Sequence, residues 1–96
     1  MGTLFKNGTI ITASDIIKGD ILVEGEIITL IGHDISTDGH TVVDCSDKYL
    51  MPGGIDVHTH LDLPFGGTVS NDDFDVGHVA AAFGGTTTHI DFAIQP

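Results

Sequence analysis

Two histidines separated by one residue are the strongest chemical signal in the sequence. They lie in residues 55–60 (IDVHTH), which alternate in polarity with a period of two. This pattern predicts a β-strand whose Asp56, His58 and His60 side chains share one face, with the two histidines about 6.6 Å apart along the strand. Two such imidazoles can tilt toward one cation at about 2.0–2.1 Å, and zinc, manganese, iron or cobalt would suit them. The alternative is two ordinary hydrogen-bonded histidines.

Other polar residues near this pair in sequence or type are weaker candidates. Asp56 and Asp62 could each accept a hydrogen bond from an imidazole N–H, or could simply be solvated carboxylates. His89 and Asp91 repeat the same spacing and form a rival pair, whereas His78 is interpreted as a surface residue. Catalytic metal sites usually have three protein ligands, so further ligands and the catalytic base are expected outside this chain.

Residues 53–96 read as a strand, a loop over residues 61–69, a helix and a second strand. The helix is predicted to begin after a cap at Ser70 or Asn71 and to end at Gly84–Gly85. An apolar stripe with helical spacing consists of Val76, Val79, Ala80 and Phe83. The β-rich residues 86–92 follow as the second strand. This order is typical of the opening of a parallel α/β barrel, whose active sites lie at the carboxyl ends of the strands.

Residues 1–52 read as short strands separated by turns. The Asn7–Gly8 dipeptide predicts a hairpin between residues 4–6 and 9–12. The other predicted strands are residues 20–23, 27–31, 42–45 and 49–51, the first two forming another hairpin. Together they predict an antiparallel sheet that forms one layer of a sandwich, whose second layer comes from elsewhere.

Composition excludes several classes of protein. The 96 residues include three Lys and Arg against 14 Asp and Glu, which gives a net charge of −11. This charge argues against binding nucleic acid or an anionic membrane surface. No apolar run approaches the roughly 20 residues that span a bilayer, and the first residues do not form a signal peptide. The single Cys45 rules out an intrachain disulfide, is interpreted as a small buried hydrophobe, and suits a cytoplasmic protein.

Residues 51–68 (MPGGIDVHTHLDLPFGGT) resemble the signature of the dihydropyrimidinase and D-hydantoinase branch of the amidohydrolase superfamily. Residues 80–88 (AAAFGGTTT) and 6–10 (KNGTI) continue the resemblance, which covers nearly the whole chain. It implies that residues 1–52 are the N-terminal part of a β-sandwich domain. Residues 53–96 would then be the first strand, helix and second strand of a TIM-like (β/α)8 barrel that is incomplete in this chain.

The same resemblance implies a chemistry. His58 and His60 would bind one metal of a two-zinc centre bridged by a carboxylated lysine, with manganese as an alternative metal. The lysine, two further histidines and the catalytic aspartate of the family have no counterpart within this chain. The implied reaction is metal-assisted hydrolysis of dihydropyrimidine or hydantoin rings to N-carbamoyl amino acids, catalysed by a homotetramer. The chain alone is expected to be inactive.

The residues after the histidines narrow the expected substrate. Dihydroorotases, which resemble this family, carry an arginine where Asp62 stands, so an anionic substrate is disfavoured here. Leu63 and Phe65 would line an apolar pocket for a ring substituent, or would pack on the barrel rim. The alternatives are another cyclic amidase such as allantoinase, a non-catalytic dihydropyrimidinase-related scaffold, and a small stand-alone metal-binding protein.

Overall fold

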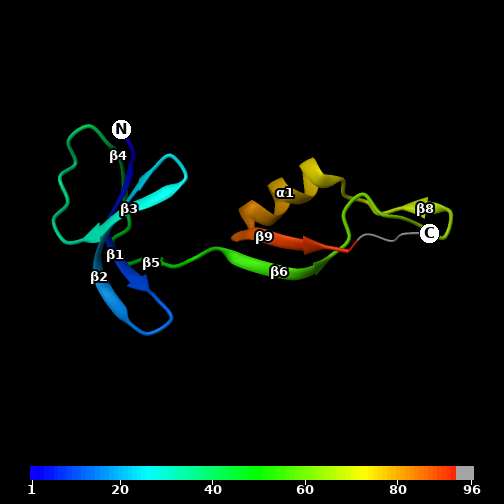
Figure 1. The fold of residues 1–96 in the computed structure, drawn as a ribbon, viewed down its shortest axis with the longest axis horizontal. Coiled ribbons are helices and arrows are strands. Elements are labelled where there is room, and N and C mark those ends of the chain that lie inside the picture. Colours follow the sequence, from blue (N-terminus) through cyan, green and yellow to red (C-terminus); the bar gives the residue numbers. More distant parts are fainter. Residues whose placement is uncertain (93–96) are drawn as a thin grey trace. The chain divides into compact units, whose positions relative to one another are not determined.

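The chain forms two compact units, Met1–Met51 and Pro52–Pro96, in a computed structural model. The structure describes residues 1–92, apart from the side chain of Phe65. Figure 1 traces both units along the chain. The break between the units falls immediately before Pro52-Gly53-Gly54, one residue from the boundary expected from the change in sequence character.

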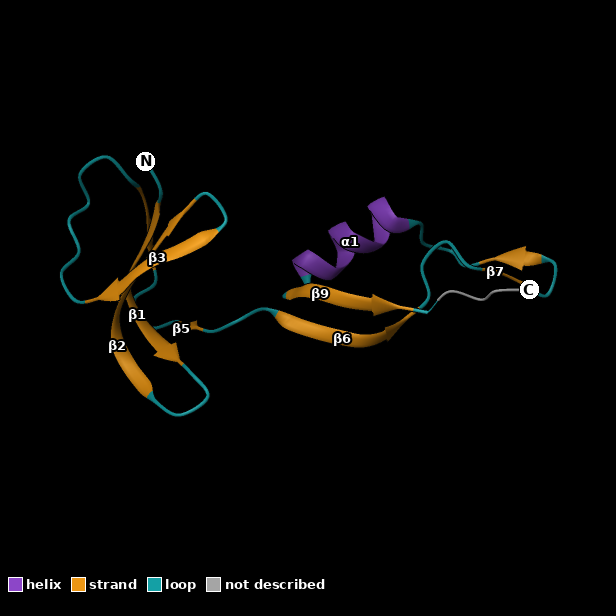
Figure 2. Cartoon of the chain, viewed as in Figure 1, coloured by secondary structure: helices purple, strands orange, loops and turns teal. Residues whose placement is uncertain are grey.

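The first unit is a five-stranded mixed sheet (Figure 2). Its strands are β1 (Thr3–Ile11), β2 (Ile16–Glu24), β3 (Ile27–Gly32), β4 (Thr41–Asp44) and β5 (Tyr49–Leu50). The order is β3-β2-β1-β4, and β5 also pairs with β1. The predicted β2–β3 hairpin is confirmed. The expectation of a purely antiparallel sheet is wrong, because the connection through residues 33–40 returns the chain so that β4 and β5 run parallel to β1.

The Asn7–Gly8 dipeptide is a bulge and not the predicted hairpin turn. β1 continues through it, with a register shift between Phe5 and Gly8 and a left-handed φ of 63° at Asn7. The turn from β1 to β2 lies at residues 12–15 instead, where the Thr12 N–H donates to the Asp15 carbonyl at 2.9 Å. A Cβ atom on Gly8 would lie 2.5 Å from Leu50 Cδ1, so the bulge also brings β5 close to β1.

Four buried side chains form the core of the first unit. They are Leu4, Ile10, Leu22 and Cys45, and the interpretation of Cys45 as a buried hydrophobe is confirmed. Other large apolar side chains of the sheet are exposed, among them Ile16, Ile27, Ile28 and Tyr49. A sheet with one buried side and exposed apolar side chains agrees with one layer of a sandwich, and the second layer stays a prediction.

A buried carboxylate ties three parts of the first unit together. Asp20 Oδ2 accepts from Lys6 Nζ at 2.9 Å and from the Ile35 N–H at 3.1 Å, and Asp20 Oδ1 accepts from the Asn7 N–H at 2.9 Å. Burial alone would raise the pKa of Asp20, but these hydrogen bonds outweigh it and lower the pKa below its ordinary value of 3.8. The ionised carboxylate therefore stabilises the bulge of β1.

The second unit has the predicted order of strand, loop, helix and strand. Its elements are β6 (Gly54–Thr59), β7 (Pro64–Phe65), β8 (Thr68–Val69), α1 (Phe74–Phe83) and β9 (Thr86–Asp91). β6 and β9 pair in parallel, and Figure 1 shows α1 running alongside them. Within the expected loop, β7 and β8 form a small hairpin whose turn residues Gly66 and Gly67 both have positive φ, at 60° and 83°.

Helix α1 begins later than expected. Its N-cap is Asp73, whose side chain accepts from the Val76 N–H at 2.8 Å, and not Ser70 or Asn71. Ser70 instead bonds Leu63 in both directions at 2.8 Å. The predicted end at Gly84–Gly85 is confirmed, with a left-handed φ of 87° at Gly85. Within residues 1–92, no helix is long and apolar enough to span a membrane.

The apolar stripe of α1 does not face the sheet of this unit. Val76 and Val79 are more than half exposed, and Phe83 is 92% exposed. The buried helical residue is Gly77, where an added Cβ would lie 2.6 Å from Leu61 Cδ2. The helix therefore packs against the loop residue Leu61 through Gly77, because a larger side chain would not fit there.

Candidate metal centre

His58 and His60 come together at the carboxyl end of β6. β6 ends at Thr59, so His60 lies one residue beyond the strand. The two Nε2 atoms are 3.2 Å apart, and the rings meet edge to face with centroids 5.0 Å apart. Both side chains are exposed. The two nitrogens are thus within hydrogen-bonding distance of each other, and the role of the pair as metal ligands stays a prediction.

The separation of these nitrogens fits two ligands of one cation. Two ligands at about 2.0–2.1 Å in a tetrahedral site are about 3.3 Å apart, close to the observed distance. Both Nε2 atoms can offer lone pairs only if each ring carries its proton on Nδ1. Residues 1–92 contain no group of three or more His, Cys, Asp or Glu that could hold a metal. The pair therefore fits part of a metal site, which other ligands would have to complete.

Phe92 contacts this pair of histidines, and the sequence did not predict that contact. Its ring centroid lies 4.2 Å from that of His58 and 6.1 Å from that of His60. The Phe92 N–H donates to the Thr59 carbonyl at 3.0 Å. The available signal was topological, since two adjacent parallel strands end at the same edge of a sheet. The histidines therefore have an aromatic ring on one side.

The position of Asp56 departs from the strict alternation of faces expected for this strand. The register of β6 against β9 shifts between Asp56 and Thr59, and these two residues line one pocket together with Gly77 of α1. Strict alternation would place them on opposite faces, so a bulge in the strand overrides the period of two. Asp56 Oδ1 accepts from the His58 backbone N–H at 3.1 Å and contacts that backbone, not the ring.

The loop residues after the histidines are positioned mainly by their backbones. Asp62 has an exposed side chain and a left-handed φ of 52°, and its N–H donates to the Asp72 carbonyl at 2.9 Å. Leu63 is partly buried. The side chain of Phe65 lies outside the described part of the structure. Roles for Asp62, Leu63 and Phe65 beside the metal or the substrate stay predictions.

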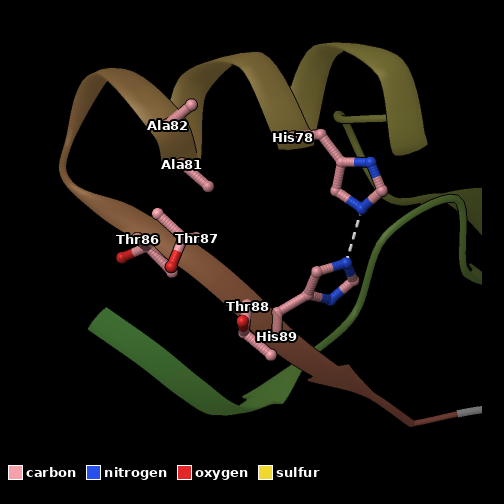
Figure 3. A pocket seen from close by; sticks show the side chains of 7 residues that line it. All are labelled: His78, Ala81, Ala82, Thr86, Thr87, Thr88 and His89. Carbon is pink, nitrogen blue, oxygen red and sulfur yellow. Dashed lines mark hydrogen bonds between the residues drawn. The ribbon is translucent and has the colours of Figure 1, made fainter. Parts of the chain in front are cut away.

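A second imidazole pair lies between α1 and β9. His78 and His89 place their Nε2 atoms within hydrogen-bonding distance, and Figure 3 shows the two rings facing each other. Together with small side chains they line a pocket of about 360 Å³ that His58 and His60 do not line. His78 is exposed as interpreted, but it is not isolated. His89 Nδ1 and Asp91 Oδ1 both lie within hydrogen-bonding distance of Thr59 Oγ1, and the rival pair of His89 with Asp91 as metal ligands stays a prediction.

Comparison with known proteins identifies relatives of this chain. It is 55% identical to a D-hydantoinase of Geobacillus stearothermophilus, over 98% of this chain and 20% of that protein. It is also 55% identical to a dihydropyrimidinase of Dictyostelium discoideum, over 95% of this chain and 18% of that protein. This chain is a homologue of one part of the D-hydantoinases and dihydropyrimidinases. The resemblance carried by residues 51–68 is therefore confirmed, although no family model matches the chain.

Solved hydantoinase structures have the same fold over these residues. A D-hydantoinase crystal structure matches all of this chain and 21% of that protein, with a TM-score of 0.95 and 50% identity. The dihydropyrimidinase of Brevibacillus agri matches over the same shares, with a TM-score of 0.94 and 50% identity. The chain spans about a fifth of the length of these hydantoinases and dihydropyrimidinases.

Proposed function

We propose that this chain is the N-terminal part of a metal-dependent hydrolase that opens dihydropyrimidine or hydantoin rings to N-carbamoyl amino acids. The observation that carries the proposal is the 3.2 Å separation of His58 Nε2 and His60 Nε2 at the end of β6. The 55% identity to a D-hydantoinase supports the reaction class. The complete protein would contain a (β/α)8 barrel and a two-zinc or two-manganese centre, and would work as a cytoplasmic homotetramer.

The residues of this chain would bind and orient one cation. His58 and His60 would each provide a neutral Nε2, which requires the proton of each ring to stay on Nδ1. Phe92 lies against the His58 ring and limits its rotation. When bound, the cations would supply an activated water and polarise the ring carbonyl. The general base and the remaining ligands would come from outside this chain, which holds no third ligand within residues 1–92.

Removing either histidine tests this proposal in the complete protein. We expect His58→Ala and His60→Ala each to lower ring opening of dihydrouracil and hydantoin by about 100-fold or more and to reduce the zinc bound per chain. His33→Ala, in an exposed loop of the first unit, is the matched control and should change neither. Zinc content by mass spectrometry and product formation by chromatography give the two readouts.

Two results would contradict the proposal. Full zinc content and activity in both variants would remove His58 and His60 from the metal centre. A wild-type protein that binds zinc at these histidines but opens neither ring would favour another cyclic amidase such as allantoinase.

The chain of 96 residues should be inactive by itself. It contains the proposed His58 and His60 ligands but, within residues 1–92, no group of three metal-binding side chains. The same ring-opening assay on the isolated polypeptide with added zinc checks this expectation. Turnover that depends on His60 would show that the missing ligands are dispensable.

A further inference from the structure

Thr59 lies between the two proposed ligands in the sequence. Its side chain forms hydrogen bonds with residues of the adjacent strand β9. Its Oγ1 lies 2.9 Å from His89 Nδ1, 3.1 Å from Asp91 Oδ1 and 3.2 Å from the Ile90 carbonyl. A hydroxyl has one proton to donate, and a carboxylate is the stronger acceptor. The consistent arrangement is that Thr59 donates to Asp91 and accepts from His89 Nδ1–H. His89 Nε2 then accepts from His78.

The residue after His60 is bonded to the same carboxylate. The Leu61 N–H donates to Asp91 Oδ1 at 2.9 Å, so one oxygen accepts from both sides of His60. The Leu61 side chain packs against Gly77 of α1. His60 is therefore flanked by two residues that β9 and α1 hold in place.

The strand itself provides little regular pairing at this point. β6 ends at Thr59, and its register against β9 is interrupted between Asp56 and Thr59. His58 and His60 are exposed, so burial does not fix their rings. A backbone hydrogen bond from the Phe92 N–H to the Thr59 carbonyl is the pairing before His60, and the carboxylate of Asp91 adds the bond to the Leu61 N–H after it.

From this geometry we propose that Asp91 is a positioning residue for the metal centre. By accepting from the Thr59 hydroxyl and from the Leu61 N–H, its carboxylate holds the two neighbours of His60 and so keeps His60 Nε2 next to His58 Nε2. This inference rests on the proposed function, because it gives the two histidines the role of ligands. A site held within about 0.5 Å of its working geometry binds better than one that must be ordered on binding.

Substitution of Asp91 in the complete protein tests the proposal. Asp91→Ala removes the acceptor, and we expect cobalt affinity, measured by chelator competition, to fall about 10- to 100-fold. The visible absorption of the cobalt-loaded protein should change in intensity or position. Asp91→Asn keeps an acceptor oxygen for Thr59 and Leu61 and should restore most of the affinity. Asp38→Ala, an exposed carboxylate of the first unit, should leave affinity and spectrum unchanged.

The outcomes separate this inference from the proposed function. If Asp91→Ala binds cobalt as tightly as the wild type with the same spectrum, while His60→Ala does not, the positioning role is overturned and the proposed ligands stand. If neither His58→Ala nor His60→Ala alters cobalt binding, both proposals fail. If Asp91→Ala does not fold, Thr59→Val decides, since it removes the hydroxyl and keeps the shape. A wild-type cobalt spectrum in Thr59→Val would overturn the role, and an altered one would support it.

Discussion

Different kinds of contact stabilise the two units of this chain internally. The unit Met1–Met51 has a core of buried apolar side chains, including Leu4 and Leu22, and a buried carboxylate at Asp20. In the described part of the unit Pro52–Pro96, the buried residue is Gly77, and side chains such as Asp91 and Asp73 bond the backbone instead. The proposed chemistry lies in this second unit.

This difference means that single polar side chains have different consequences in the two units. In the first unit, one polar group contributes to stability in addition to a core of buried apolar side chains. In the second, one carboxylate oxygen of Asp91 accepts from both neighbours of His60. Functional sites are often found where local stability is low, because side chains there must stay accessible to ligands. We therefore expect core substitutions to affect folding and polar substitutions in the second unit to affect binding.

Truncating the core of the first unit should give the largest effect on stability. Leu4 is fully buried, and Leu4→Ala should cost about 2–5 kcal/mol through lost contacts and the cavity left behind. Amide hydrogen exchange of the complete protein should show lower protection in β1 and β2. The amides of β6 and β9, and the cobalt affinity of the folded protein, should stay as in the wild type. An equal loss of protection in β6 and β9 would show that the two units are not independent in this way.

Removing the buried charge of the first unit should have a smaller effect that depends on pH. Asp20→Asn should cost about 1.5–3 kcal/mol near neutral pH, because charge-assisted hydrogen bonds are lost. The pKa of Asp20 is lowered on folding, so its contribution is complete above about pH 4 and is lost as the pH falls through the folded-state value. The stability gap between wild type and variant, measured by urea unfolding, should therefore narrow in acid. A constant gap down to pH 2 would contradict the lowered pKa.

Removing the helix cap of the second unit should have the smallest effect. Asp73 accepts from the Val76 N–H, and Asp73→Ala should cost about 1 kcal/mol and lower the exchange protection of the first turn of α1. Asp75→Ala, in the same turn but not at the cap, is the control and should cost less. Equal losses in the two variants would mean that the cap hydrogen bond contributes nothing beyond the negative charge.

The local elements of this fold could be predicted from sequence, but their long-range arrangement could not. The alternation around His58 predicted β6, and the two glycines predicted the end of α1. Asn7 adopts the left-handed φ that a hairpin turn needs, yet a bulge can use the same conformation. Which of them forms depends on β5 and Asp20, which lie far away in the sequence.

Only part of the candidate site could be predicted from sequence, for the same reason. The spacing of His58 and His60 places both rings at the carboxyl end of β6, where their Nε2 atoms lie 3.2 Å apart. Phe92 contacts the His58 ring, and Asp91 bonds the two neighbours of His60, because β9 pairs beside β6. No spacing rule shows which side chain will bond which backbone. The apolar stripe of α1 is exposed, and the helix packs Gly77 against Leu61, a contact that the sequence pattern does not indicate.

The most direct test of the account is the position of the metal. Crystals of the complete protein grown with zinc should give an anomalous peak at the zinc absorption edge, about 2.0–2.2 Å from both His58 Nε2 and His60 Nε2. Data collected below the edge should lose the peak. A structure with zinc bound elsewhere, and with the two rings turned apart or bonded only to each other, would contradict the central claim that this pair binds a catalytic cation.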